Sequence, residues 1–378
     1  LQWRLNVNCA IVTTTHDSFN AWRTRRGEDT TDAFPPRAQV GQFLADTWSA
    51  AVRRAPAHVR IRHLPHRVSE VSRDEESFVV DGTPFDEVLV CTGHDHLHAG
   101  ALTYEASCVP LTGLYFGADL PSSARRIGVR GAALSFIDVC LLYGDTAETI
   151  YPVSRSGRFM EVKPSPETPL PEVSPRWRQA CAHIDNAAEL REILIGAAGE
   201  FGDFSTGVLA AVIDGQDFTG DAVAELEASL RAAEGTGPLT PAAAVGAAFR
   251  GVFQECVDWH KAHGPMPGFR ELSRTLERVA FGPPPVTARR LLELIHSGVV
   301  NTDYLDTPGQ IDSWREKGGV DLLIDATVAP QATPSPFHDV AGVVEIGRMN
   351  ELSLPGHDSL NRSVHDDIPR WAEKVGNP

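Results

Sequence analysis

The sequence lacks the features of a membrane-spanning or exported protein. No run of about 18 apolar residues is present, which excludes an ordinary transmembrane helix. A basic start followed by an apolar stretch, as in a signal peptide, is also missing. Positive charge is in deficit, because 34 Lys and Arg stand against 50 Asp and Glu and give a net charge of −16. This balance argues against nucleic acid or an anionic membrane as the main partner.

Cysteine is scarce and shows no metal-binding or redox spacing. The six cysteines are Cys9, Cys91, Cys108, Cys140, Cys181 and Cys256. No C-x-x-C pair occurs, so a disulfide-type reductase and a zinc site of cysteines are not indicated. Several cysteines lie in apolar runs, and we predict that most are reduced core residues of a cytoplasmic protein without a resident metal.

The chain is long and apolar enough for more than one packed unit. It has 378 residues, of which 42% are apolar. An amphipathic helix is predicted from Phe34-Pro-Pro-Arg37 to about Arg54. A small β meander is predicted from Val59–His63, Ser77–Val80 and Phe85–Cys91, with a turn at Asp81-Gly82.

Residues 164–298 carry few strand signals and many Ala, Leu and Glu residues. Helices are predicted from Thr240-Pro241 to Gly264, from Thr219 to Gly235, and from Thr287 to His296 with a stop at Gly298. We interpret this block as a helical insertion in an α/β domain. That domain resumes with the apolar strand Val320–Thr327.

The most informative stretch is Arg126–Met160. A short apolar run leads into the turn Gly131-Ala132-Ala133, an apolar helix-like segment from Leu134 and Ser135 onward, and a second strand from Ile150 to Val153. This strand–turn–helix–strand order is typical of a dinucleotide-binding unit, in which a pyrophosphate meets backbone N–H groups. Ser154, Arg155 and Arg158 follow the second strand. A hydroxyl and two cations there favour a 2′-phosphate, hence NADP(H) over NAD(H).

Other interpretations of the same residues stay open. The glycine fingerprint keeps one glycine, so the turn also fits an ordinary α/β core, and the arginines fit a solvated loop. His94–His98 alternates imidazoles, which fits a metal site or a solvated loop. Ser135 with Asp138 also fits the nucleophile and acid of a hydrolase, but the G-x-S-x-G motif around such a serine is absent. Trp259, His260 and His263 near a helix end favour packing over a site.

The chain resembles the two-dinucleotide-domain FAD/NAD(P)-binding proteins that include the aspartate N-monooxygenases. The motifs that carry the resemblance are Phe34-Pro-Pro-Arg37, Val88–His94, Gly131–Asp138, Ser154–Arg158, Phe281–Pro284, Ile346–Arg348 and Gly356–Leu360. The string Gly356–Leu360 is also similar to the tail of ornithine and lysine N-hydroxylases. These motifs cover nearly the whole chain in the family's order.

The resemblance implies FAD and NADP as cofactors, and it implies site residues. It places Thr92 and Gly93 at the crossing between the two domains, with His94 beside them, and Gly347 and Arg348 near the flavin. Arg37 belongs to the first motif. The NADP pyrophosphate would lie at Gly131–Ser135 and the 2′-phosphate at Ser154, Arg155 and Arg158. No catalytic residue is assigned, because the cofactors carry the chemistry.

The implied fold is α/β with two Rossmann-like domains and a large helical insertion in the NADP domain. Residues 1–105 form a partial FAD-binding domain, 106–163 and 299–330 the NADP-binding domain, 164–298 the insertion, and 331–378 the C-terminal FAD segment. The front lacks the family's G-x-G-x-x-G turn, so we expect the FAD domain to be incomplete. The edge this exposes makes a homo-oligomer conceivable.

The implied function is an FAD- and NADPH-dependent monooxygenase that oxygenates the nitrogen of a small-molecule substrate, an amino acid or a small amine. NADPH would reduce the flavin, which would then react with dioxygen. Two alternatives stay open. One is another flavin-dependent reductase or oxidase, and the other is a non-catalytic NADP-binding homologue.

Overall fold

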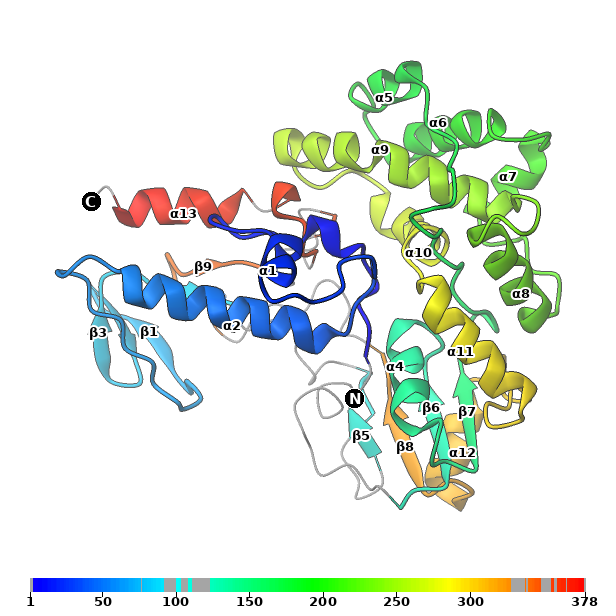
Figure 1. The fold of residues 1–378 in the computed structure, drawn as a ribbon, viewed down its shortest axis with the longest axis horizontal. Helices are drawn as coiled ribbons and strands as arrows, with labels where there is room; N and C mark the ends of the chain where they lie inside the picture. The colour runs from blue at the N-terminus through cyan, green and yellow to red at the C-terminus, as the bar shows by residue number, and fades with distance from the viewer. Residues whose placement is uncertain are drawn as a thin grey trace. The chain divides into compact units, whose positions relative to one another are not determined.

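The computed structural model describes residues 3–75, 77–91, 100–102, 108–110, 123–327, 337, 339–347, 355–356, 359–364 and 366–376 (Figure 1). The chain divides into two compact units, each with its own internal contacts. Unit 1 comprises residues 1–7 and 96–328, and unit 2 comprises residues 8–95 and 329–378. Both contain helices and strands, so the protein is mixed α/β, as the sequence predicts.

Unit 1 contains a parallel sheet of four strands in the order β5-β8-β6-β7 (Figure 1). The strands are β5 (Cys108–Pro110), β6 (Arg126–Arg130), β7 (Thr149–Val153) and β8 (Leu322–Asp325). Helix α4 (Leu134–Tyr143) connects β6 to its parallel neighbour β7. Strand β8 then pairs with the other side of β6. The chain therefore switches sides at β6, and in open parallel sheets ligands bind beyond the carboxyl ends of strands at such a point.

The period of two along the strands sends alternate side chains to the two faces of this sheet. Ile127, Val129 and Ile324 join one apolar core, together with residues of α4, α8 (Ala222–Ala233) and α11 (Pro285–His296). On the other face, Leu323 packs with Trp314 of α12 (Gln310–Lys317). Both faces are covered, which explains why apolar residues fill the middle of β6 and the first three positions of β8.

A helical block follows β7 in the chain (Figure 1). Its first helices are α5 (Pro175–Cys181), α6 (Ala187–Gly199) and α7 (Thr206–Ile213), and after α8 come α9 (Pro241–His263) and α10 (Phe269–Ala280). A second apolar core joins α5, α6, α7, α9 and α10. The chain returns through α11 and α12 to β8.

The helix predictions from turn residues are confirmed, with shifts at two starts. Helix α9 begins after Thr240, whose hydroxyl accepts the Ala243 N–H at 3.0 Å, and it ends at Gly264 with φ 83°. Helix α8 starts at Ala222 rather than near Thr219, because the Asp221 carboxylate accepts two first-turn N–H groups. Helix α11 starts at Pro285, earlier than predicted.

Unit 2 is described by itself. It contains η1 (Cys9–Ile11), α1 (Phe19–Arg25), α2 (Arg37–Arg54), the antiparallel strands β1 (Val71–Arg73), β2 (Phe78–Val80) and β3 (Thr83–Phe85), the parallel pair β4 (Leu89–Val90) and β9 (Val344–Glu345), η3 (Arg362–Val364) and α13 (Asp367–Gly376). The predicted turn is confirmed, with positive φ at Asp81 and Gly82. The predicted strand Val59–His63 is wrong, since this segment is irregular and its Val59 and Ile61 are exposed.

The described residues show how the cysteines are buried and whether a helix could cross a membrane. Five cysteines are buried and Cys91 is exposed, so burial of most cysteines is confirmed. Across the described ranges, no helix is both long and apolar enough to cross a membrane.

Candidate functional site

The turn after β6 lies where the two central strands of the parallel sheet end together. Gly131 has φ 123°, a conformation that L side chains rarely adopt. A Cβ at this position would lie 3.1 Å from the carbonyl oxygen of Ala326, the residue after β8. The Gly131 N–H donates to the Val153 carbonyl at 2.8 Å, which joins the turn to the end of β7. Glycine is therefore required both by the backbone angle and by the close approach of the neighbouring strand's end.

Helix α4 begins directly after this turn without a side-chain cap. Its N-cap residue is Ala133, and no side chain among the described residues accepts a hydrogen bond from its first turn. Ala133 is exposed, and Leu134 and Ser135 are half-buried, whereas Ala132 is buried. Uncapped N–H groups at a helix N-terminus favour an anion, because the helix dipole places partial positive charge there. The structure thus brings the predicted residues Gly131–Ser135 into one anion-compatible turn.

A buried carboxylate fixes the end of β8 beside the turn. Asp325 is 2% exposed and accepts the backbone N–H of Leu102 at 2.8 Å and the hydroxyl of Thr327 at 2.6 Å. The guanidinium of Arg130, the last residue of β6, lies 3.3 Å from the same carboxylate. Sequence analysis missed this group, since two of its partners, Leu102 and Arg130, lie 223 and 195 residues away along the chain.

The end of β7 carries the residues predicted for a 2′-phosphate. The Ser154 N–H donates to the Leu305 carbonyl at 2.8 Å, and the Ser154 Oγ accepts the Gly157 N–H at 3.1 Å. Arg155 is exposed, and no hydrogen bond or ion pair with another described residue engages its side chain. Ser154 and Arg155 can therefore meet a ligand from solvent.

Arg158 lies in a different setting from Arg155. It is 7% exposed, and its guanidinium forms a bidentate pair with Asp217 and a 3.0 Å bond to Glu225. Burial alone would lower the pKa of Arg158, but the Asp217 and Glu225 carboxylates outweigh burial and raise it. Despite burial, Arg158 and Arg278 lower the pKa of Asp217. The structure thus commits Arg158 to carboxylates, which sequence analysis did not foresee.

Three further ionisable groups follow in the same part of unit 1, of which Glu161 is buried and Lys163 and Arg250 are half-buried. Burial raises the pKa of Glu161, whose carboxylate accepts the Thr240 hydroxyl at 3.2 Å. Burial, helped by the nearby charge of Arg250, lowers the pKa of Lys163 to about 7. The Lys163 ammonium donates to the Asn6 carbonyl. Burial also lowers the pKa of Arg250 to about 10.

In unit 2, the pairing of β4 with β9 brings two predicted segments to one edge. The strands are parallel, with Leu89 opposite Val344, so Cys91 and Gly347 follow strands that end on the same side. Gly347 has φ 90°. Arg37 is the first residue of α2 and is half-buried.

Four predicted site residues lie outside the described residues. They are Thr92, Gly93, His94 and Arg348. The alternating histidines from His94 to His98 lie there as well.

The other constellations of the sequence have packing roles in unit 1. His260 is 3% exposed, its Nδ1 lies 2.8 Å from the Cys256 carbonyl, and burial lowers its pKa. The Trp259 indole donates to the Ile184 carbonyl at 2.6 Å, and His263 stacks on its ring. Within the described ranges, no group of three His, Cys, Asp or Glu side chains could hold a metal ion.

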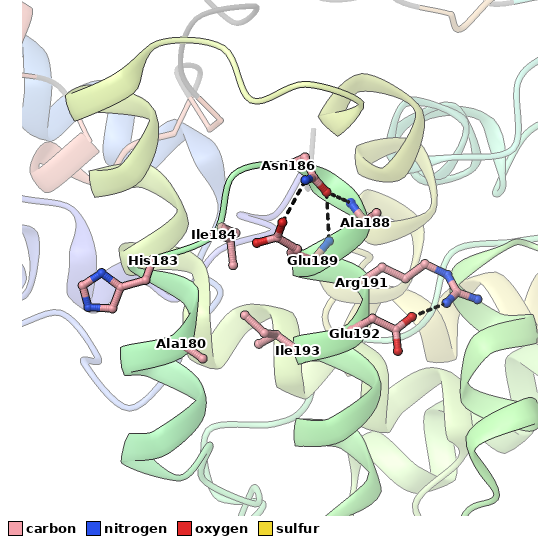
Figure 2. Close-up of a pocket in the computed structure, with 9 residues that line it drawn as sticks. All are labelled: Ala180, His183, Ile184, Asn186, Ala188, Glu189, Arg191, Glu192 and Ile193. Carbon is pink, nitrogen blue, oxygen red and sulfur yellow. Dashed lines mark hydrogen bonds and ion pairs between the residues drawn. The ribbon is translucent and has the colours of Figure 1, made fainter.

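A hollow of about 630 Å³ lies in the helical block at α5 and α6 (Figure 2). Its polar groups bind one another: the Asn186 amide donates to the Glu189 carboxylate at 2.9 Å, and the Asn186 Oδ1 accepts the N–H groups of Ala188 and Glu189 in the first turn of α6. Arg191 pairs with Glu192 and Asp214. These contacts cap and brace a helix, and the hollow contains none of the predicted site residues.

Comparison with known proteins agrees with a dinucleotide-binding protein. Residues 2–95 match the profile of a family described as FAD-NAD(P)-binding. No curated protein matches the chain.

Among solved structures, the chain is similar to the ornithine N-hydroxylase of Kutzneria sp. 744, in a structure with reduced FAD, NADP+ and L-ornithine. The identity is 13%, the TM-score 0.42, and 99% of this chain and 88% of that chain are covered. It is also similar to the cadaverine monooxygenase of Erwinia amylovora bound to FAD. There the identity is 12%, the TM-score 0.48, and the coverage 100% of this chain and 85% of that chain.

Proposed function

We propose that this chain binds NADPH at the carboxyl ends of β6 and β8 and acts as an FAD- and NADPH-dependent monooxygenase. The observation that carries the proposal is the β6–α4–β7 unit, in which Gly131 turns the chain with φ 123° into an uncapped helix. A pyrophosphate fits this turn, because the N–H groups of Ala132 to Ser135 carry no side-chain cap in the described structure. The family match at residues 2–95 supports the same cofactor class.

The end of β7 favours the phosphorylated dinucleotide. Ser154 and the exposed Arg155 would hold the 2′-phosphate, since a hydroxyl donor and a free guanidinium suit a dianion. The segment Ser154–Arg158 offers no carboxylate for a ribose 2′-hydroxyl. Arg158, the last residue of this segment, is buried and paired with Asp217.

The proposed domains follow the sequence motifs. Residues 106–163 and 299–330 form the NADP domain, which residues 164–298 interrupt as a helical insertion. Residues 1–105 and 331–378 contribute the FAD domain. Support for this assignment comes from the parallel sheet of β5, β6, β7 and β8 and from the pairing of β4 with β9.

In unit 2 the proposed FAD residues follow the family motifs. They are Arg37, Thr92, Gly93, His94, Gly347 and Arg348. The parallel β4–β9 pair supports the assignment, because Cys91 and Gly347 leave the pair at one edge.

The proposed reaction is oxygenation of the nitrogen of an amino acid or a small amine. When bound, NADPH supplies a hydride and the flavin supplies the reaction with dioxygen. The chain's own residues then act by binding and orientation. Gly131 lets the dinucleotide approach the backbone, and Asp325 holds the ends of β6 and β8 together through Arg130.

A visible absorption spectrum of the purified chain tests the proposal, first with added FAD and then with NADPH. We expect flavin bands that bleach with NADPH and recover in air. Bands that bleach but do not recover in air would indicate a reductase. NADPH binding without flavin bands would leave a non-catalytic homologue, and binding of neither dinucleotide would refute the proposal.

A further inference from the structure

The loop from Ser154 to Arg158 is held by hydrogen bonds and close packing at the end that follows β7. Ser154 is held by the Leu305 carbonyl, and its Oγ closes a turn with the Gly157 N–H. Gly157 has φ 62°, and a Cβ there would lie 2.8 Å from the Cβ of Asp306. The loop therefore has little freedom between β7 and Gly157.

The far end of the loop is anchored in the helical block by charge. Both terminal nitrogens of Arg158 bind the Asp217 carboxylate, and its Nε binds Glu225 of α8 at 3.0 Å. The guanidinium also lies over the Phe218 ring, 5.3 Å from its centroid. A second cation, Arg278, lies 3.4 Å from Asp217. A bidentate, buried pair of this kind fixes direction as well as distance.

We propose that Asp217 is a positioning residue for selectivity between NADPH and NADH. It keeps Arg158 in the helical block and thereby holds Ser154 and Arg155 at the end of β7, where they meet the 2′-phosphate. This inference rests on the proposed NADPH site. It gives the helical block, about sixty residues further along the chain, a part in choosing the cofactor.

The sign of the effect separates positioning from simple charge. An acidic residue near a phosphate site repels the phosphate, so its neutralisation alone strengthens phosphate binding. Positioning predicts the opposite, because Asp217→Asn releases Arg158 from its bidentate partner and loosens the far end of the loop, on which the setting of Arg155 also depends. Binding of NADH lacks the 2′-phosphate and is expected to stay unchanged.

The experiment is a titration of the full chain with NADPH and with NADH, followed by calorimetry. Asp217→Asn is compared with Asp214→Asn, a matched control three residues away whose carboxylate pairs with Arg191 of α6 at 2.7 Å. We expect about tenfold weaker NADPH binding for Asp217→Asn, the effect of one charge-assisted contact, with NADH within twofold of wild type. Asp214→Asn should match wild type, and Asp217→Glu should restore part of the selectivity.

Three results would overturn the inference. The first is that the wild-type chain prefers NADPH, and the Asp217→Asn variant binds NADPH as tightly as the wild type or more tightly. Another is an equal loss for both dinucleotides. If Asp217→Asn does not fold, Glu225→Gln is the substitute, because it weakens the anchor of Arg158 and keeps the bidentate pair with Asp217. We expect Glu225→Gln to lower the NADPH preference about twofold. An unchanged preference in this variant is the third result that would overturn the inference. A wild-type chain that binds neither dinucleotide would instead refute the proposed function itself.

Discussion

The ends of β6 and β7 lie in the same unit and make different kinds of site. After β6 the chain offers backbone: a glycine with φ 123°, two alanines and an uncapped helix. After β7 it offers side chains: the half-buried Ser154, the exposed Arg155, and Arg158 paired with Asp217. The first site depends on neighbouring residues in sequence and the second on a distant helical block.

This difference separates two functions that a dinucleotide site needs. Backbone N–H groups hold the pyrophosphate of any dinucleotide, so the turn after β6 is indifferent to the 2′ position. Charged side chains distinguish NADPH from NADH, so the loop after β7 sets the preference. Changes at the two ends should therefore have different signatures.

The largest effect is expected from Gly131→Val. The substitution places a branched side chain at φ 123°, beside the Ala326 carbonyl, and strain of about 1–3 kcal/mol is expected. NADPH and NADH binding should both fall more than about tenfold, because the pyrophosphate turn itself is displaced. Gly264→Ala is the control, since Gly264 also has positive φ but open space around it. It should lower the melting temperature and leave both affinities intact.

The next effect is a pH dependence of stability that comes from the half-buried Lys163. Its pKa falls from the usual 10.5 to about 7 on folding, so the unfolded chain holds more protons between these values. The free energy of unfolding therefore gains up to ~1.4 kcal/mol per pH unit from this group as pH rises from about 7 to 10.5. Below pH 7 the full penalty remains.

Lys163→Met tests this prediction by denaturant unfolding at several pH values. The variant should exceed wild type in stability most at pH 7, and the gap should close toward pH 10. A gap that is independent of pH would contradict it. Arg289→Met, at an exposed ion pair with Glu234 in the same unit, is the control and should show no such gap.

Arg155→Ala should remove the preference for NADPH and leave the pyrophosphate turn after β6 unaffected. Loss of one charge-assisted contact to the 2′-phosphate should weaken NADPH binding about tenfold and leave NADH binding unchanged. Calorimetry with both dinucleotides measures the ratio. The control is Arg126→Ala at the other end of β6, where the guanidinium faces Asp321 at 3.5 Å. An equal loss for both dinucleotides would show that Arg155 does not read the 2′ position.

The smallest effect is expected from Asp221→Ala in the helical block. The Asp221 carboxylate caps α8 by accepting the N–H groups of Val223 and Ala224 at 3.1 and 3.0 Å. Its loss should cost about 1 kcal/mol in unfolding free energy. The NADPH preference should not change, because the contacts of Asp217 with Arg158 and Arg278 remain. A changed preference would mean that the stability of the whole helical block, rather than the Asp217–Arg158 pair, determines the position of the Ser154–Arg158 loop.

The sequence predicts local features of this molecule well and distant partners poorly. The cap at Thr240, the stop at Gly264 and the β6–α4–β7 order follow from neighbouring residues, and the structure contains all three. The alternation at Val59–His63 also resembles a strand, but a strand needs a partner, and the described residues provide none for it. The same limit applies to Arg158, whose carboxylate partner lies 59 residues away.

The pairing of β6 with β8 has a consequence for synthesis of the chain. The two strands are separated by about 195 residues, so the ribosome must translate the helical block before β8 exists. Helices form through local contacts and need not wait, whereas pairing across such a separation is slow. Until β8 arrives, the apolar edge of β6 is open in the nascent chain and is available to chaperones or to another copy. Completion of the central sheet is thus expected late, after the helical block has folded.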